Sequence, residues 1–143
     1  MKSINYERTG EYLKTCLQIL KKKGGECPSN ELIKEMEKHL SFDDYEKSFN
    51  NSGQLRWLTH FRFYSINLVK AGWIIKKGGK WILTDKAKGF EIMTPADIYN
   101  FGSNAYESWN SSRGNNNEIL DEDEKEEVYV FTITNKNEKE SSN

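Results

Sequence analysis

The chain has few of the residues that build disulfide-linked or membrane-embedded proteins. Its 143 residues include only two cysteines, Cys16 and Cys27, and two prolines. Two cysteines provide no framework of disulfides, so we expect both to be reduced thiols. No stretch approaches the roughly 18 consecutive apolar residues that span a bilayer, and the amino terminus lacks the apolar centre of a signal peptide. A cytoplasmic protein without a membrane partner is the expectation that follows.

Histidine and cysteine, the usual ligands of zinc, are also scarce. The two histidines, His39 and His60, would complete a set of four ligands with the cysteines. None of these four residues has the close-paired spacing that zinc sites usually show. We therefore expect no metal site and no other cofactor.

Acidic residues are unevenly distributed along the chain. Residues 1–90 hold 17 Lys and Arg against 10 Asp and Glu, a formal charge of +7, whereas the remaining 53 residues hold 4 against 12, or −8. The whole-chain charge of −1 hides this asymmetry. A basic amino-terminal part is compatible with a polyanionic partner.

Two amphipathic helices are predicted in the first third of the chain. In residues 12–23 apolar side chains recur at intervals of three and four, and a Gly-Gly pair ends the pattern. A second helix of about ten residues has Ser29 or Asn30 as its cap. A short capped turn and a loop at residues 50–53 lead to the next helix.

The third helical pattern covers residues 55–71. One apolar and aromatic stripe should face the core. It comprises Trp57, Phe61, Tyr64, Leu68 and Ala71. Residues off this stripe should face elsewhere. They include Thr59, His60, Phe63, Asn67 and Lys70.

A β-hairpin is predicted directly after this helix. Gly72 suits the left-handed position that ends a helix, and the β-prone runs "WII" and "KWILT" flank a "KKGG" turn. This arrangement places Lys76, Lys77 and Lys80 at the tip of the hairpin.

Two different kinds of sequence follow the hairpin. Thr94 as a cap, followed by proline, predicts a helix of roughly 15 residues. From Asn110 the chain is polar and acidic, apart from the strand-like run "VYVFTIT" at residues 128–134. We expect a domain at residues 1–110 and an acidic, mostly disordered linker or tail at residues 111–143. The strand-like run would pair outside the domain or begin a further one.

The order of elements predicts the fold class. Three helices followed by a hairpin, in a mainly α domain, is the order of a winged helix-turn-helix. In that fold the third helix lies in the DNA major groove and the hairpin, or wing, touches the flanking backbone.

The chain also resembles the amino-terminal domain of Mrr-type restriction enzymes, which cut DNA carrying modified bases. The resemblance covers roughly residues 6–109. It rests on "SG" at residues 52–53, "INLVKAGWI" at 66–74, "KKGGKWILTDKAKGFE" at 76–91 and "TPADIY" at 94–99. The resemblance implies a module of a bacterial defence system that binds double-stranded DNA and is attached to a nuclease domain.

Catalysis is not expected from this sequence. The chain stops about where the nuclease of the resembled family would begin, and the acidic run at residues 120–127 lacks the flanking apolar strands that metal-dependent nucleases need. The expected partners are duplex DNA and either a nuclease domain or subunit or a second copy of the chain.

The DNA contacts divide into two groups. The hairpin lysines Lys76, Lys77 and Lys80 should bind phosphates. Candidate contacts from the third helix and the preceding loop are Gln54, Arg56, His60, Arg62, Phe63, Asn67 and Lys70. Arg and Asn can pair bidentately with guanine and adenine, and Phe63 is the candidate for touching a methyl group or stacking.

A second interpretation stays open. The winged helix would then be a protein interaction or dimerisation module, in which Phe63, Tyr64 and the third helix meet a partner. Salt separates the two, because lysine contacts to DNA weaken steeply as salt rises and apolar contacts do not.

The acidic tail gives a first testable prediction. Its charges at residues 121–127 should compete with DNA for the lysines, as a local polyanion would. Deleting residues 111–143 should therefore tighten non-specific duplex binding at low salt, as measured by fluorescence anisotropy. Equal affinities with and without the tail would contradict this.

Overall fold

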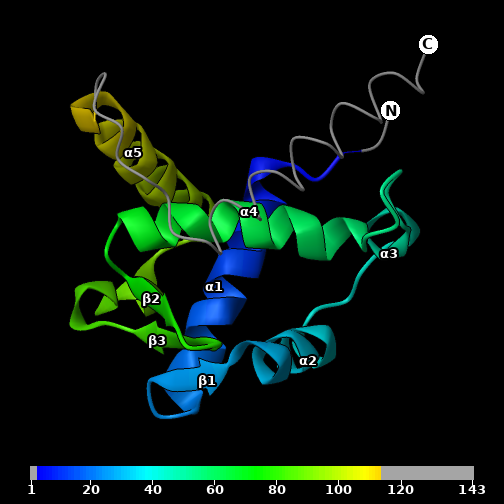
Figure 1. Ribbon diagram of the computed structural model, residues 1–143, viewed down its shortest axis with the longest axis horizontal. Helices are drawn as coiled ribbons and strands as arrows, with labels where there is room; N and C mark the ends of the chain where they lie inside the picture. The colour runs from blue at the N-terminus through cyan, green and yellow to red at the C-terminus, as the bar shows by residue number, and fades with distance from the viewer. Residues whose placement is uncertain (1–2, 114–143) are drawn as a thin grey trace.

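The computed structural model describes residues 3–113, which form a mainly helical domain with a small antiparallel sheet (Figure 1). The elements in chain order are α1 (Tyr6–Lys22), β1 (Glu26–Pro28), α2 (Ser29–His39), α3 (Asp44–Lys47), α4 (Arg56–Lys70), β2 (Ile74–Lys77), β3 (Lys80–Leu83), the 3-10 turns η1 (Asp85–Ala87) and η2 (Phe90–Ile92), and α5 (Pro95–Arg113). The strand-like run at residues 128–134 and almost all of the acidic tail lie outside the described residues.

The first two helices form where they were predicted, with different starts. α1 begins six residues earlier, at Tyr6, because the side chain of Asn5 caps it by accepting a hydrogen bond from the Arg8 N–H at 2.8 Å. α2 begins at Ser29 and has Pro28 as its N-cap residue, without a side-chain cap. The predicted cap at Ser29 or Asn30 is therefore wrong, since Pro28 already holds the extended entry conformation.

The sheet has three strands in the order β1-β3-β2. The predicted hairpin is confirmed: β2 and β3 pair antiparallel, with Lys77 opposite Lys80 across a Gly-Gly turn. β1 was not predicted, because it is only three residues long and ends in proline. It pairs with β3 and places Cys27 opposite Trp81.

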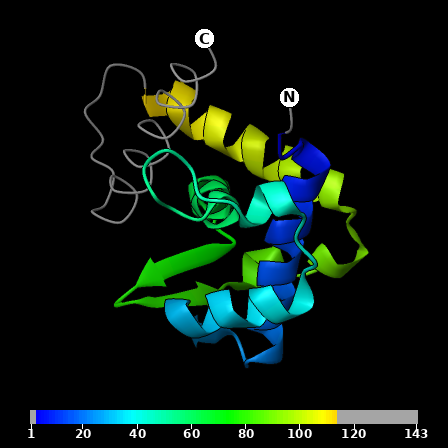
Figure 2. The same cartoon turned by 90° about the vertical axis from the view of Figure 1, so that its right-hand side faces the viewer.

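α1 is the central element of the domain. α2, α4, α5, β1 and β3 all pack against it, and Figures 1 and 2 show α5 and α2 near its two ends. Its apolar stripe is fully buried, as the spacing predicted. The stripe includes Leu13, Cys16, Leu17 and Leu20. Both cysteines are buried free thiols, and burial raises the pKa of Cys16 to about 12.

α4 contributes the aromatic part of the core. Phe61 stacks on Trp81 of β3 with ring centroids 5.5 Å apart, and Trp57 stacks on Phe42 at 4.4 Å. Trp57, Phe61 and Leu68 are buried as predicted, whereas Tyr64 and Ala71 are only partly buried.

The prediction that Asn67 and Thr59 face away from the core is wrong. Asn67 is 8% exposed and Thr59 is 7% exposed. For Asn67 the reason is α5, which packs along α4 so closely that a Cβ built on Gly102 would lie 3.1 Å from the Asn67 Cβ. The apolar periodicity of a helix identifies the face that packs on the core, but it does not show whether a second helix covers another face.

α5 starts as predicted and extends further. The Thr94 hydroxyl caps it by accepting from the Asp97 N–H at 3.1 Å, and the helix reaches Arg113. It meets α1 at Gly10, where a built Cβ would lie 1.9 Å from the Pro95 carbonyl oxygen. Only a glycine permits this approach of the two backbones.

Replacing Gly10 with Ala should therefore separate α5 from α1. Because the obstacle is backbone rather than a flexible side chain, we expect a loss of about 2 to 3 kcal/mol in the free energy of unfolding, measured by urea denaturation. Gln18→Ala, at an exposed position of the same helix, is the control and should change stability by less than about 0.5 kcal/mol. A Gly10→Ala protein of unchanged stability would show that α5 does not need this contact.

Candidate nucleic-acid interface

Residues 47–84 contain no acidic residue. This segment holds seven Lys and Arg side chains, namely Lys47, Arg56, Arg62, Lys70, Lys76, Lys77 and Lys80. It comprises the last residue of α3, the following loop, α4 and the hairpin, which follow one another in space as well as in sequence (Figure 1). Comparing the two halves of the sequence does not reveal this acid-free segment, but a count in shorter windows does.

The hairpin tip displays two of these cations to solvent. Lys77 and Lys80 are exposed, and as directly opposed residues of an antiparallel pair they share one face. Like charges in this position repel, and among residues 3–113 the carboxylate that offsets them is that of the exposed Glu26, 3.7 Å from the Lys80 ammonium. An anion between the two lysines would relieve the repulsion.

Lys76 lies on the same strand but is turned inward. Its Nζ donates to the Ser65 hydroxyl at 2.8 Å and lies 4.4 Å from the centre of the Trp81 ring. These contacts tie the hairpin to α4. These contacts hold Lys76 against α4 and β3, and the phosphate contact suggested by the sequence stays a prediction.

Arg56 is likewise engaged within the domain. Its guanidinium lies 4.5 Å from the centre of the Tyr45 ring and donates to the Ser48 hydroxyl at 3.0 Å and to the Phe49 carbonyl at 3.2 Å. It therefore fixes the loop between α3 and α4.

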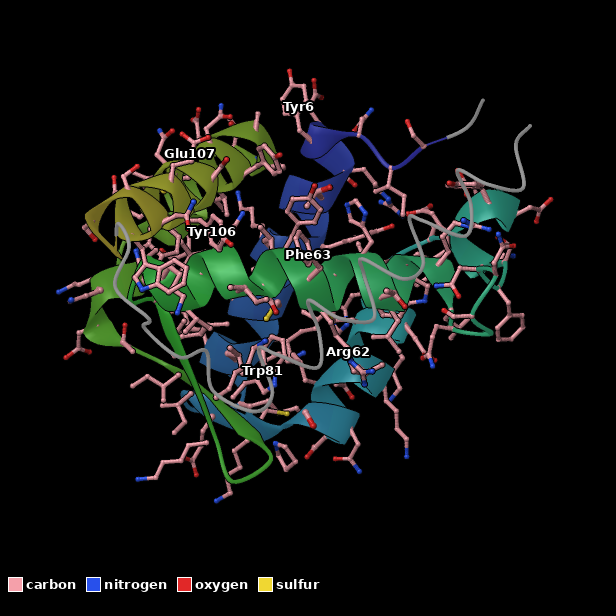
Figure 3. All side chains as sticks on the ribbon, turned by 45° about the horizontal axis from the view of Figure 1, so that its top comes forward. Tyr6, Arg62, Phe63, Trp81, Tyr106 and Glu107 are labelled. Carbon is pink, nitrogen blue, oxygen red and sulfur yellow. The ribbon has the colours of Figure 1, made fainter. Side chains whose placement is uncertain are left out.

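Arg62 occupies the exposed part of α4. Figure 3 shows Arg62 and Phe63 on different sides of the helix. Within residues 3–113 the Arg62 guanidinium makes no hydrogen bond or ion pair. Gln54, just before α4, is also exposed, whereas Phe63 is half-buried beside Tyr64 at a centroid distance of 5.1 Å.

The other candidate side chains of α4 contact neighbouring elements of the domain, with Asn67 buried and His60 and Lys70 half-buried. Asn67 packs against α5, and the Lys70 ammonium lies 3.9 Å from the centre of the Trp109 ring on the same helix α5. His60 Nε2 is 2.7 Å from the Thr9 hydroxyl, between the rings of Tyr64 and Tyr12. None of these three side chains is fully exposed to solvent.

A part-buried ion pair between Arg8 and Glu46 holds α3, which leads into the candidate interface. Glu46 of α3 is 5% exposed and accepts from Arg8 of α1 at 2.7 Å and from the Tyr12 hydroxyl. It also accepts from the Asp43 N–H at 2.9 Å, and the Asp43 side chain accepts from the Glu46 N–H, forming a capping box. The "DDYE" spacing is the sequence signal for this box.

Within the described part of the chain, no group of three His, Cys, Asp or Glu side chains is arranged to hold a metal ion. No helix among residues 3–113 is both long enough and apolar enough to cross a bilayer. Comparison with protein family models, curated proteins and solved structures finds no significant match to the chain.

The half-buried imidazole of His60 predicts a pH dependence of stability. Burial disfavours the charged imidazole and lowers its pKa to about 4, despite the nearby Glu46 carboxylate. The unfolded chain takes up this proton near its ordinary pKa of 6.5, so the free energy of unfolding should fall as pH decreases from about 6.5 to 4.

His60→Gln should remove this part of the fall, as measured by urea denaturation across that pH range. His39→Gln, at an exposed position of α2, is the matched control and should keep the wild-type slope. Identical slopes for wild type and His60→Gln would place the imidazole in contact with solvent.

Proposed function

We propose that this chain is a winged-helix module that binds duplex DNA. The observation that carries the proposal is the acid-free segment 47–84, whose seven cations lie at the end of α3, on α4 and on the hairpin. A polyanion meets no opposing carboxylate from this segment, and the long-range field favours its approach.

The arrangement of elements supports the same proposal. Helix, strand, helices and hairpin follow in the order of a winged helix, and the first strand adds to the hairpin in the order β1-β3-β2. α4 takes the position of the helix that enters the major groove, and the β2–β3 hairpin takes that of the wing.

The side chains divide between two tasks. Lys77 and Lys80 bind phosphates next to the groove and hold the protein in register on the duplex. Arg62, with its planar set of donors, reaches base edges or the backbone from the middle of α4. Lys76 and Arg56 hold the hairpin and the loop in place, and His60 and Asn67 pack against α1 and α5.

The Mrr-type resemblance extends the proposal to the target. It favours DNA with a modified base, and Phe63, beside Tyr64 on α4, is the candidate for contact with a methyl group. A binding screen with plain, adenine-methylated and cytosine-modified duplexes would identify the preferred form.

The proposal predicts a specific salt dependence. Binding of a labelled duplex, followed by anisotropy, should weaken steeply as salt rises, and Lys77→Ala or Lys80→Ala should each lower the log–log slope by about 0.9, without changing sequence preference. Lys88→Ala is the matched control, because Lys88 is exposed but lies outside residues 47–84. Arg62→Ala should cost about 1 to 3 kcal/mol on the preferred duplex and less on a scrambled one.

Two results would contradict the proposal. A protein that binds no duplex at low salt is not a DNA-binding module of this kind. If Lys88→Ala lowers the slope of the salt dependence as much as Lys77→Ala or Lys80→Ala does, the whole surface, and not the hairpin, attracts the duplex.

A further inference from the structure

The loop at residues 48–55, between α3 and α4, holds an aromatic side chain in solvent. Phe49 is 66% exposed. Of the seven aromatic residues in the acid-free segment 47–84, it is the one whose side chain is exposed, since the others are buried or half-buried. A single exposed aromatic residue is common, so a binding role for Phe49 has to be argued from the structure of the loop that carries it.

Asn50, next to Phe49, organises this loop. Its side-chain oxygen accepts from the Ser52 N–H at 3.0 Å, the Ser52 hydroxyl at 2.8 Å and the Gln54 N–H at 2.9 Å. Its backbone N–H donates to the Gln54 carbonyl at 2.8 Å, and Phe49 forms a β-bridge with Leu55. The loop is therefore closed at its base and cross-linked across its interior.

The backbone of Phe49 is held from the other side as well. The Arg56 guanidinium donates to the Phe49 carbonyl and the Ser48 hydroxyl while it rests on the Tyr45 ring. These contacts fix the backbone from which the ring projects, so its side chain enters a contact with little loss of backbone entropy.

The position of Phe49 indicates the partner. The 48–55 loop is neutral, and it lies at the opposite end of α4 from the hairpin (Figure 1). α4 has 15 residues and is therefore about 22 Å long at 1.5 Å per residue, which corresponds to roughly six base-pair steps of 3.4 Å. A duplex that contacts the hairpin and α4 would therefore also pass close to the 48–55 loop, at the edge of the binding site opposite the hairpin.

We propose that Phe49 stacks on a base at this edge of the site and favours a base that is unpaired or readily unstacked. This inference rests on the proposed DNA binding and adds a contact at the loop. A flat ring on a fixed neutral loop fits the face of a base, because stacking needs no charge and tolerates any base. Because hydrogen bonds hold the backbone of the loop, the base has to reach the ring, and a deformable step is preferred.

The test is a set of otherwise identical duplexes in which a single unpaired base is moved along the site. The wild-type full-length chain should bind one position about tenfold more tightly than the fully paired duplex. Phe49→Ala should abolish this preference and keep the salt slope, while Phe49→Trp should retain it. Phe49→Leu should lose most of it, because it keeps apolar bulk without a flat ring.

Ile92→Ala is the matched control, since Ile92 is 91% exposed and lies outside the acid-free segment. All Phe49 variants should melt like the wild type, because the side chain contributes little buried surface. The inference is overturned if the wild type prefers no unpaired position, or if Phe49→Ala or Phe49→Leu keeps the preference in full. Failure of the wild type to bind any duplex would instead remove the proposed function itself.

Discussion

Glu46 lies in the interior between α1 and α3, where its carboxylate accepts hydrogen bonds from Arg8, Tyr12 and the backbone of Asp43. Burial alone would raise the pKa of this carboxyl, but these donors lower it below its ordinary range. The ionised form is thus the one the fold requires. Its stabilising contribution is present above the ordinary pKa of the group and is lost as the pH falls through the lowered value.

The position of α4 depends on this ion pair. α3 is only four residues long and has no independent stability, so Glu46 and the capping box determine where it lies against α1. The 48–55 loop starts from α3 and delivers the chain to Arg56, the first residue of α4. Removing Arg8 would leave the buried Glu46 carboxylate with only the Tyr12 and Asp43 donors, which destabilises the packing of α3 against α1. Such a change in α1 would disturb the candidate interface, to which α1 itself contributes no side chain.

Sequence reasoning succeeded where one local signal determines the structure. Gly72, with φ of 79°, ends α4 as expected, and the Gly-Gly turn gives the hairpin. It failed where a distant element decides. His60 and Asn67 look like surface residues of a helix, but Thr9 of α1 and Gly102 of α5 pack against them. No periodicity within residues 55–71 contains that information.

The same limit applies to the basic residues. Lys76 and Lys77 are adjacent and identical in type, yet the alternation of the strand turns Lys76 toward Trp81 and leaves Lys77 in solvent. Arg56 and Lys70 are also drawn to aromatic rings, of Tyr45 and Trp109. The number of cations was readable from the sequence. Which of them remain available to a partner depends on where tertiary packing places the aromatic side chains.

The geometry of the hairpin turn has a consequence for how the tip can vary. Gly78 and Gly79 both have positive φ, a backbone conformation that other residues rarely adopt, so the turn disfavours a side chain at either position although the space around both is open. The nearest side chains that can carry charge are therefore those of Lys77 and Lys80, whose backbones are held about 5.5 Å apart by the strand pairing. Because the two lysine side chains are long and flexible and start from neighbouring backbones, both ammonium groups can contact a single oxyanion. Substitutions at Lys77 and Lys80 can therefore change the affinity of the hairpin tip for an anion without changing its backbone structure.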